Sequence, residues 1–144
     1  MHILVTGGTG FIGSHTCVSL IEAGHDVTII DDLSNSRREA LDCVEQISGK
    51  RPTFFEGDVR DRELLRKIFA QRPVDSVIHF AGLKAVGESV VQPLRYYDCN
   101  VGGAIVLCEE MAAAGVKSII FSSSATVYGD PASVPIREDF PRST

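Results

Sequence analysis

A glycine-rich turn near the N-terminus constrains this chain more than any other feature. It reads GGTGFIG over residues 7–13, follows the β-branched run HILVT and opens an amphipathic stretch. The turn fits both G-x-G-x-x-G and G-x-x-G-x-x-G, and the acidic Asp31 comes 18 positions after Gly13. Glycines let the backbone approach a pyrophosphate, which then lies at the helix N-terminus. This context favours dinucleotide binding over a tight turn without a ligand.

Short apolar runs alternate with longer amphipathic stretches along the whole chain. Strands are predicted over residues 2–6, 26–31, 53–56, 75–80 and 117–122. Helices are predicted over residues 11–23, from Ser36 to Gly49, after a capping Asp61, and over residues 93–114. This alternation predicts an α/β fold with a Rossmann-like, doubly wound parallel sheet of strand order 3-2-1-4-5, incomplete at its C-terminus.

Length and charge exclude several classes of protein. The 144 residues suffice for one domain, and 14 Lys+Arg against 19 Asp+Glu leave a formal net charge of −5. A nucleic-acid binder would need a positive footprint, and no apolar run approaches the roughly 18 residues of a membrane span. The N-terminus lacks the features of a signal peptide. We therefore expect a cytoplasmic protein with neither a nucleic-acid nor a membrane partner.

The four cysteines give no support to a metal site. They stand at positions 17, 43, 99 and 108 and form no C-x-x-C pair. Without such a pair or a His-rich cluster, we expect no metal. Cys17 and Cys108 fall on apolar faces of predicted helices, which indicates buried, inert thiols.

The second strand ends in residues that suit a ribose. The carboxylate of Asp31 can accept both hydroxyls of an adenosine ribose and would repel a 2′-phosphate, which favours NAD over NADP. Arg37 and Arg38 are the counter-evidence, but we expect them inside the next helix as solvated charges. Residues 32–36 can add contacts to the ribose and phosphate; the alternative is simple helix capping by a Ser or Asn of this run.

The later strands end in residues that suit the same crevice. Asp58 can accept from the adenine amino group, with helix capping as the alternative. Residues 80–84 read FAGLK, in which small residues admit a cofactor and Lys84 offers a cation to its oxygens. The serines at 122–124 can bond a substrate hydroxyl or pass its proton, unless they only form a turn. His79 has apolar neighbours and is expected to be packed rather than to act as a base.

These residues resemble the extended short-chain dehydrogenase/reductase family and, within it, the UDP-hexose 4-epimerases. The matching stretches are VTGGTGFIGSHT, IIDDLSNS, EGDVRD, HFAGLKAVGES, YYDCNVGG and FSSSATVYGD. The resemblance implies a tightly held NAD that takes hydride from C4 of a UDP-hexose and returns it to the opposite face of the 4-keto sugar. UDP-galactose and UDP-glucose would thereby interconvert in a net isomerisation.

The resemblance also implies roles for individual residues. Ser124 is the expected catalytic residue, and Lys84 and Ser124 are expected to meet the substrate. Cys99 stands at a cofactor-bordering position, where a side-chain amide contact cannot be assumed. The expected cofactor-binding residues are Gly7, Gly10, Phe11, Ile12, Gly13, Asp31, Asp32, Leu33, Ser34, Asn35, Ser36, Asp58, Val59, Phe80, Ala81, Gly82, Leu83, Lys84, Cys99, Asn100 and Ser122.

One departure from the family pattern limits these expectations. The family base is the Tyr of a Tyr-x-x-x-Lys motif, and no Tyr of this chain has a Lys at that spacing. We therefore expect residues 1–144 to be a truncated NAD-binding domain without the UDP-sugar-binding lobe, and to be inactive alone.

Two further expectations and two alternative functions complete the sequence analysis. Apolar surface beside the fifth strand should be exposed, and the resemblance suggests a homodimer. A non-catalytic NAD-binding module is one alternative function. A nucleotide-sugar dehydratase or decarboxylase is another, although those enzymes carry acidic residues where Ala125 and Thr126 stand.

Overall fold

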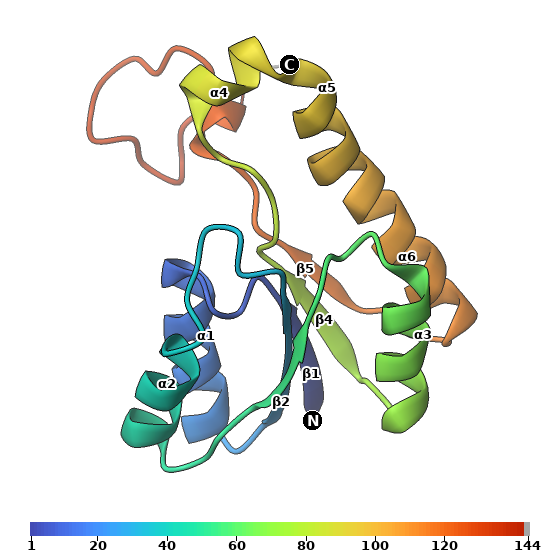
Figure 1. The fold of residues 1–144 in the computed structure, drawn as a ribbon. Coiled ribbons are helices and arrows are strands. Elements are labelled where there is room, and N and C mark those ends of the chain that lie inside the picture. The colour runs from blue at the N-terminus through green and yellow to red at the C-terminus, as the bar shows by residue number, and fades with distance from the viewer. Residues whose placement is uncertain (143–144) are drawn as a thin grey trace.

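Five parallel strands form one sheet in the computed structural model, which describes residues 1–142 (Figure 1). The strand order is β3-β2-β1-β4-β5, as the sequence predicts. In the register, Val5 lies opposite Ile29 of β2 and Ile78 of β4. The strands are β1 (His2–Thr6), β2 (Asp26–Asp31), β3 (Thr53–Glu56), β4 (Ser76–His79) and β5 (Ile119–Phe121).

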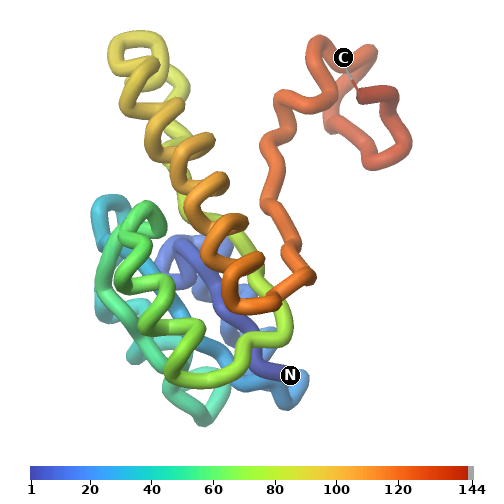
Figure 2. The backbone as a smooth tube through the Cα atoms, turned by 90° about the vertical axis from the view of Figure 1, so that its right-hand side faces the viewer, coloured from blue at the N-terminus to red at the C-terminus, as the bar shows by residue number. Residues whose placement is uncertain are grey.

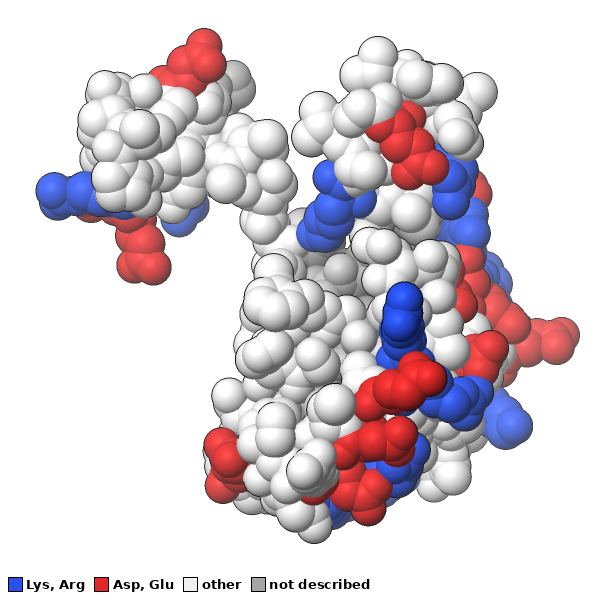
Figure 3. Space-filling model, turned by 60° about the vertical axis from the view of Figure 1, so that its left-hand side comes forward, with Lys and Arg blue, Asp and Glu red and all other residues white. Residues whose placement is uncertain are grey.

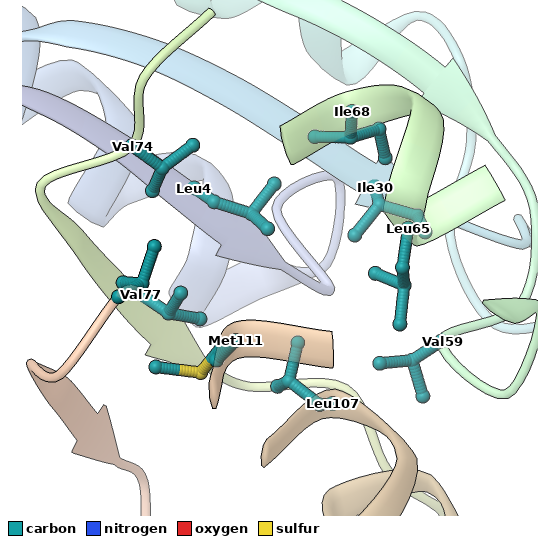
Figure 4. Close-up of a cluster of buried hydrophobic side chains, with 10 residues drawn as sticks. Leu4, Ile30, Val59, Leu65, Ile68, Val74, Val77, Leu107 and Met111 are labelled. Atoms are coloured by element: carbon teal, nitrogen blue, oxygen red, sulfur yellow. The ribbon is translucent and has the colours of Figure 1, made fainter. Parts of the chain in front are cut away.

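Helices cover both faces of the sheet, so its central strands are apolar on both sides. Helices α1 (Phe11–Glu22) and α2 (Ala40–Ser48) pack on one face, and α3 (Arg62–Gln71) and α6 (Gly103–Ala113) on the other (Figure 1). Alternate strand residues supply the two cores. Figure 4 shows the core under α3 and α6, where Leu4, Ile30 and Val77 of the sheet meet Leu65 and Leu107.

Helix α2 begins later than the sequence predicts. It starts at Ala40 rather than at Ser36, and Arg37 and Arg38 therefore lie in the preceding turn and not inside the helix. The reason is that the Ser36 hydroxyl donates to the carboxylate of Asp31 at 2.8 Å, which holds this segment against the end of β2. Ser36 is thus a loop residue and not a helix cap.

A long helical arm rises from the body of the molecule (Figure 2). It consists of α5 (Pro93–Tyr96), a π-helical segment (Tyr97–Gly102) and α6, which agrees with the helix predicted over residues 93–114. The sequence did not predict the π-helical segment, nor the short helix α4 (Val86–Val91) before it. Gly103 allows the arm to pack closely, because a Cβ there would lie 2.9 Å from Val59.

Strand β5 ends the sheet and leaves apolar side chains exposed, as expected. Ile119, Ile120 and Phe121 are 39%, 59% and 59% exposed. After a 3-10 turn (Ala125–Tyr128), the C-terminal segment stands apart from the body (Figure 2). Figure 3 shows a part of the molecule that protrudes to one side and carries charged side chains on its lower surface.

The cysteines follow the prediction in part. Cys17 is buried, and this burial raises the pKa of its thiol to about 12. Cys108 is exposed, so the prediction of a buried thiol is wrong there. Its neighbour Leu107 and Met111 face the core, and a step of one residue turns a side chain about 100° around the helix.

Neither a membrane-spanning helix nor a metal-binding cluster is found among the described residues. Within residues 1–142, no helix is long and apolar enough to cross a membrane. The same residues contain no group of three or more His, Cys, Asp or Glu side chains placed to hold a metal ion.

Candidate functional site

The glycine turn joins β1 to α1 so tightly that side chains at Gly7 and Gly13 would clash with the backbone. Gly7 has a φ of +70°, and a Cβ there would lie 2.8 Å from the backbone nitrogen of Ala81. A Cβ on Gly13 would lie 2.2 Å from the carbonyl oxygen of Gly7. The two glycines therefore bring the first turn of α1 directly against the ends of β1 and β4.

The N-terminus of α1 is open on its outer side. Its capping residue, Gly10, has no side chain that could cap the helix, and the first turn carries no acidic residue. A Cβ on Gly10 would meet only the Gly7 carbonyl oxygen, at 3.3 Å. Phe11 and Ile12 are 83% and 61% exposed. Unpaired N–H groups with a positive helix end and open space before them suit an anionic group such as a diphosphate.

Asp31 is buried at the end of β2 and organises the loop that follows it. Its Oδ2 accepts from the backbone N–H of Thr9 at 3.1 Å. Its Oδ1 accepts from the N–H of Leu33 at 3.0 Å and from the hydroxyl of Ser36 at 2.8 Å. Each carboxylate oxygen has two acceptor positions, so Asp31 retains capacity for a ribose hydroxyl.

The rest of this loop forms a small turn beside Asp31. The Oδ1 atom of Asp32 accepts from the N–H of Ser34 at 2.9 Å and from its hydroxyl at 2.6 Å. Asp32, Ser34 and Asn35 are exposed, and Leu33 adopts a φ of 58°. These side chains are accessible to a ligand at the loop's outer face.

The two arginines that opposed the NAD prediction are not in the helix where we expected them. Arg38 pairs with Glu56, and its guanidinium lies 5.0 Å from the ring centroid of Phe54. Both partners belong to β3, so the cation of Arg38 is held along that outer strand. Because Arg38 already pairs with Glu56, we do not assign it to a 2′-phosphate.

Asp58 and Val59, expected near an adenine, have different surroundings. The Asp58 side chain is 31% exposed and pairs with Arg60, whose guanidinium lowers the pKa of this carboxyl. Val59 is buried in the core beside Gly103. Cys99, on the π-helical segment, is half-buried, and burial raises the pKa of its thiol.

The segment after β4 is fixed by two side chains that come from elsewhere in the chain. The Asn100 amide forms a pair of bonds with Leu83: its Oδ1 accepts from the N–H at 2.7 Å, and its Nδ2 donates to the carbonyl at 2.9 Å. The Thr6 hydroxyl accepts from the N–H of Ala81 at 3.2 Å. Phe80 and Ala81 pack against the two cores, and Gly82 contacts Asn100. Asn100 thus contacts the loop directly.

A pocket of about 400 Å³ opens beside this loop at the carboxyl ends of β4 and β5. It brings together Lys84, Ser122 and Ser124, which the sequence placed at one rim. The Ser124 hydroxyl accepts from the N–H of Thr126 at 3.3 Å and from its hydroxyl at 3.1 Å. Because Ser124 and Lys84 are exposed, both can reach a ligand in the pocket.

His79 lines the pocket wall and is packed, as expected. It is 3% exposed, and its Nδ1 lies 2.6 Å from the hydroxyl of Thr6. Burial lowers the pKa of His79 to about 4, with a smaller contribution from the Lys84 cation. The imidazole is therefore neutral across the physiological range.

The buried neutral His79 predicts a pH dependence of stability. Because the unfolded chain takes up this proton near pH 6.5, stability is complete above that pH and falls as the pH drops toward 4. The loss is on the order of 3 kcal/mol. Urea titrations between pH 7.5 and 4 should show this slope in the native chain. His79→Asn keeps a partner for Thr6 and should flatten the slope between about pH 6.5 and 5, above the range in which carboxylates titrate. An unchanged slope in that range would contradict the assignment.

Sequence reasoning missed three side chains that shape this site. Thr6 anchors both His79 and Ala81, and its position as the last residue of β1 was the available signal. The Tyr96 hydroxyl donates to the Ala85 carbonyl at 2.9 Å, and Arg60 pairs with Asp58. Tyr96 and Arg60 gave no recognisable signal in the sequence.

A second pocket, of about 280 Å³, lies at the opposite end of the strands. Its cations are paired, since Lys50 and Arg72 both contact Asp26, and Arg51 contacts Asp42 and Glu45. It is remote from the glycine turn and from the serines, so we assign the site to the first pocket.

Known proteins are similar to this chain over almost its whole length. The NAD dependent epimerase/dehydratase family matches residues 3–144. A UDP-glucose 4-epimerase from Neisseria meningitidis serogroup A is 64% identical over 140 residues, which are 97% of this chain and 41% of the relative.

Solved structures agree with the sequence match. UDP-glucose 4-epimerase from Bifidobacterium longum, in complex with NAD+ and UDP, matches with a TM-score of 0.92 and 52% identity. UDP-glucose-4-epimerase from Stenotrophomonas maltophila, with bound NAD and formylated UDP-arabinopyranose, matches with a TM-score of 0.92 and 45% identity. Each match covers 99% of this chain and 43% of the other. The chain spans about two fifths of the length of the curated relatives it matches first.

Proposed function

The chain belongs to the NAD dependent epimerase/dehydratase family, and from this premise we propose that it is the NAD-binding part of an enzyme that interconverts UDP-galactose and UDP-glucose. The observation that carries the proposal is the pocket that joins Lys84, Ser122 and Ser124 at the strand ends beside the open N-terminus of α1. Ligands of doubly wound sheets bind at this rim. The UDP-sugar-binding lobe belongs, in this proposal, to sequence outside these 144 residues.

The residues present fit an NAD molecule. The open helix end beside Gly10 suits the diphosphate, and the one remaining acceptor position of Asp31, on Oδ2, suits a hydroxyl of the adenosine ribose. The loop of residues 80–84, tied down by Asn100, would line the cofactor on its way to the pocket. The chemistry supplied by bound NAD is reversible hydride transfer at C4 of the hexose.

Two exposed polar side chains of the pocket are assigned to contacts with the bound ligands. In this proposal the Ser124 hydroxyl bonds the hexose hydroxyl that loses its proton, and the Lys84 cation lies beside the negatively charged parts of the ligands. The proton acceptor itself is not among the described tyrosines, since none is followed by Lys at the family spacing. Ser124 would therefore orient the hydroxyl toward a base from the rest of the enzyme.

Ser124→Ala tests this assignment in the complete enzyme. We expect kcat for UDP-galactose to fall roughly 10- to 100-fold, because one hydrogen bond to the reacting hydroxyl is lost. A coupled assay of UDP-glucose formation measures the rate, and Ser19→Ala, at an exposed serine of α1 outside the pocket, is the control that should leave it near the native value.

The outcomes separate the proposed enzyme from its alternatives. Epimerisation that depends on Ser124 supports the proposal. Binding of NAD without any response to UDP-hexoses would instead identify a non-catalytic NAD-binding module. Release of water or carbon dioxide from a UDP-sugar would identify a dehydratase or decarboxylase, although Ala125 and Thr126 offer no acidic group for those reactions.

A further inference from the structure

Arg60 connects the loop after β3 with the π-helical segment. Its backbone N–H donates to Asp58 Oδ1 at 2.8 Å. Its Nε donates to both carboxylate oxygens, at 3.0 Å and 3.1 Å, and its Nη2 contacts Oδ2. Its Nη1 pairs with Asp98 on the π-helical segment. Asp58 is thus bound by one residue through both its backbone and its side chain.

This arrangement determines what the Asp58 carboxylate can recognise. Held from one side by Arg60, the carboxylate keeps one orientation, and it is 31% exposed on its other side. The adjacent guanidinium lowers its pKa, so the group stays ionised and can only accept hydrogen bonds. The four contacts come from three N–H donors, because the Nε–H is shared between both oxygens, and one of the four acceptor positions therefore remains for a ligand donor.

We propose that Arg60 is a positioning residue that orients the Asp58 carboxylate toward the amino group of adenine and thereby selects adenine over hypoxanthine dinucleotides. The inference rests on the proposed function, which puts the adenosine of NAD at this rim. Arg60 acts only through Asp58 and is not itself assigned a contact with the cofactor.

The chemistry of the two bases makes the selection specific. Adenine carries an exocyclic amine that donates to a carboxylate, whereas hypoxanthine carries a carbonyl oxygen at the same place. Two acceptors facing each other cannot bond, and an unpaired polar group in a binding site is costly. The fixed carboxylate therefore favours the first base and disfavours the second.

The pair between Arg60 and Asp98 joins the guanidinium to the π-helical segment, but the bonds that orient Asp58 come from the other nitrogens of Arg60. The π-helical segment carries Asp98 and also Asn100, which ties down Leu83. The same helical turn thus supports the loops after β3 and β4. Removal of the Asp98 charge would leave the backbone and Nε bonds of Arg60 to Asp58 intact, which makes Asp98 a useful control position.

The test compares the dissociation constants of NAD and nicotinamide hypoxanthine dinucleotide for the complete protein, freed of bound nucleotide, by calorimetry. We expect the native protein to prefer NAD about tenfold or more. Arg60→Met should weaken NAD binding about tenfold and leave hypoxanthine dinucleotide binding nearly unchanged, so the preference disappears. A purely structural role for Arg60 would weaken both dinucleotides by the same factor, and that result would overturn the inference.

Three further variants complete the test. Asp58→Ala should remove the preference for NAD, as Arg60→Met does. Asp98→Asn should keep the native ratio of the two dissociation constants. If Asp98→Asn loses the preference for NAD, the preference depends on surface charge and not on the orientation of Asp58. If Arg60→Met does not fold, Arg60→Lys carries the test, because one ammonium cannot reproduce the bonds from Nε and Nη2 and the ratio should still fall.

The native protein separates the two proposals. If it binds neither dinucleotide, the proposed function fails. If it binds both equally well, NAD binding stands and the inference about Arg60 is wrong.

Discussion

Replacement of Gly13 by alanine is expected to abolish measurable NAD binding. The new Cβ would lie 2.2 Å from the Gly7 carbonyl oxygen and 2.9 Å from the Cα of Gly8. Both contacts are with backbone, so the clash can be relieved only if the first turn of α1 moves away from the glycine turn. That movement displaces the unpaired N–H groups from the diphosphate position. Calorimetry with NAD measures the loss.

Gly87→Ala is the matched control for this substitution. Gly87 lies in α4, and a Cβ there would meet nothing within 4 Å. Alanine also has the higher helix propensity, so this variant should fold and bind NAD as the native protein does. Native-like NAD binding by Gly13→Ala would show that the turn tolerates the displacement and would contradict the role given to its tight geometry.

The sheet was predictable because its signals are local. Runs such as residues 2–6 and 26–31 are apolar on both faces, which marks central parallel strands. The helices between them follow from apolar spacing, as for Leu65 and Ile68 of α3. The cap of that helix was equally readable, since Asp61 accepts from the N–H of Leu64 at 3.0 Å.

The errors arise where a tertiary contact overrides a local preference. Ser36 has the chemistry of a helix cap, but its hydroxyl bonds Asp31 and Thr9 instead, and α2 starts four residues later. Cys108 has apolar helical neighbours, but Leu107 and Met111 are the residues of α6 that face the core, and Cys108 is exposed. The π-helical segment, in turn, has no pattern of apolar residues that would distinguish it from the α-helix predicted over residues 93–114.

The site was predictable as a set of positions but not as a set of contacts. Parallel strands bring their carboxyl ends to one rim, which is why Lys84 and Ser124 were correctly placed together. The bonds that organise the rim join residues far apart in the chain: 17 positions separate Asn100 from Leu83, and 38 separate Arg60 from Asp98. Such pairings depend on how the helical arm packs, which a single sequence does not state.

Removal of both arginines that hold Glu110 is expected to destabilise the fold far more than removal of Glu110 itself. The Glu110 side chain is 4% exposed on α6. Arg66 of α3 donates to both its oxygens at 2.9 Å, and Arg62 donates to Oε1 at 3.1 Å. Both arginines are 42% or more exposed, so only the carboxylate loses water on folding.

This asymmetry gives opposite expectations for the two deletions. Arg62→Ala/Arg66→Ala leaves a buried charge without partners and should lower Tm at pH 7 by roughly 10 °C. Glu110→Leu removes the buried charge and leaves two solvated arginines, so its Tm should change little. Glu109→Ala, which removes an exposed partner of Arg62, is the control and should have a small effect.

The pH dependence should reverse sign between the native protein and the double arginine variant. In the native protein Arg66, and to a smaller degree Arg62, lower the pKa of Glu110. The paired carboxylate therefore contributes stability above its ordinary pKa of about 4.3, and this contribution is lost as the pH falls through the lowered value. Without the arginines, burial raises the pKa instead, and acid then stabilises the folded state because it neutralises the buried charge. Thermal unfolding at pH 7 and pH 4.5 should show the Tm gap between the two proteins shrinking in acid, and a constant gap would mean that Glu110 is not the group responsible.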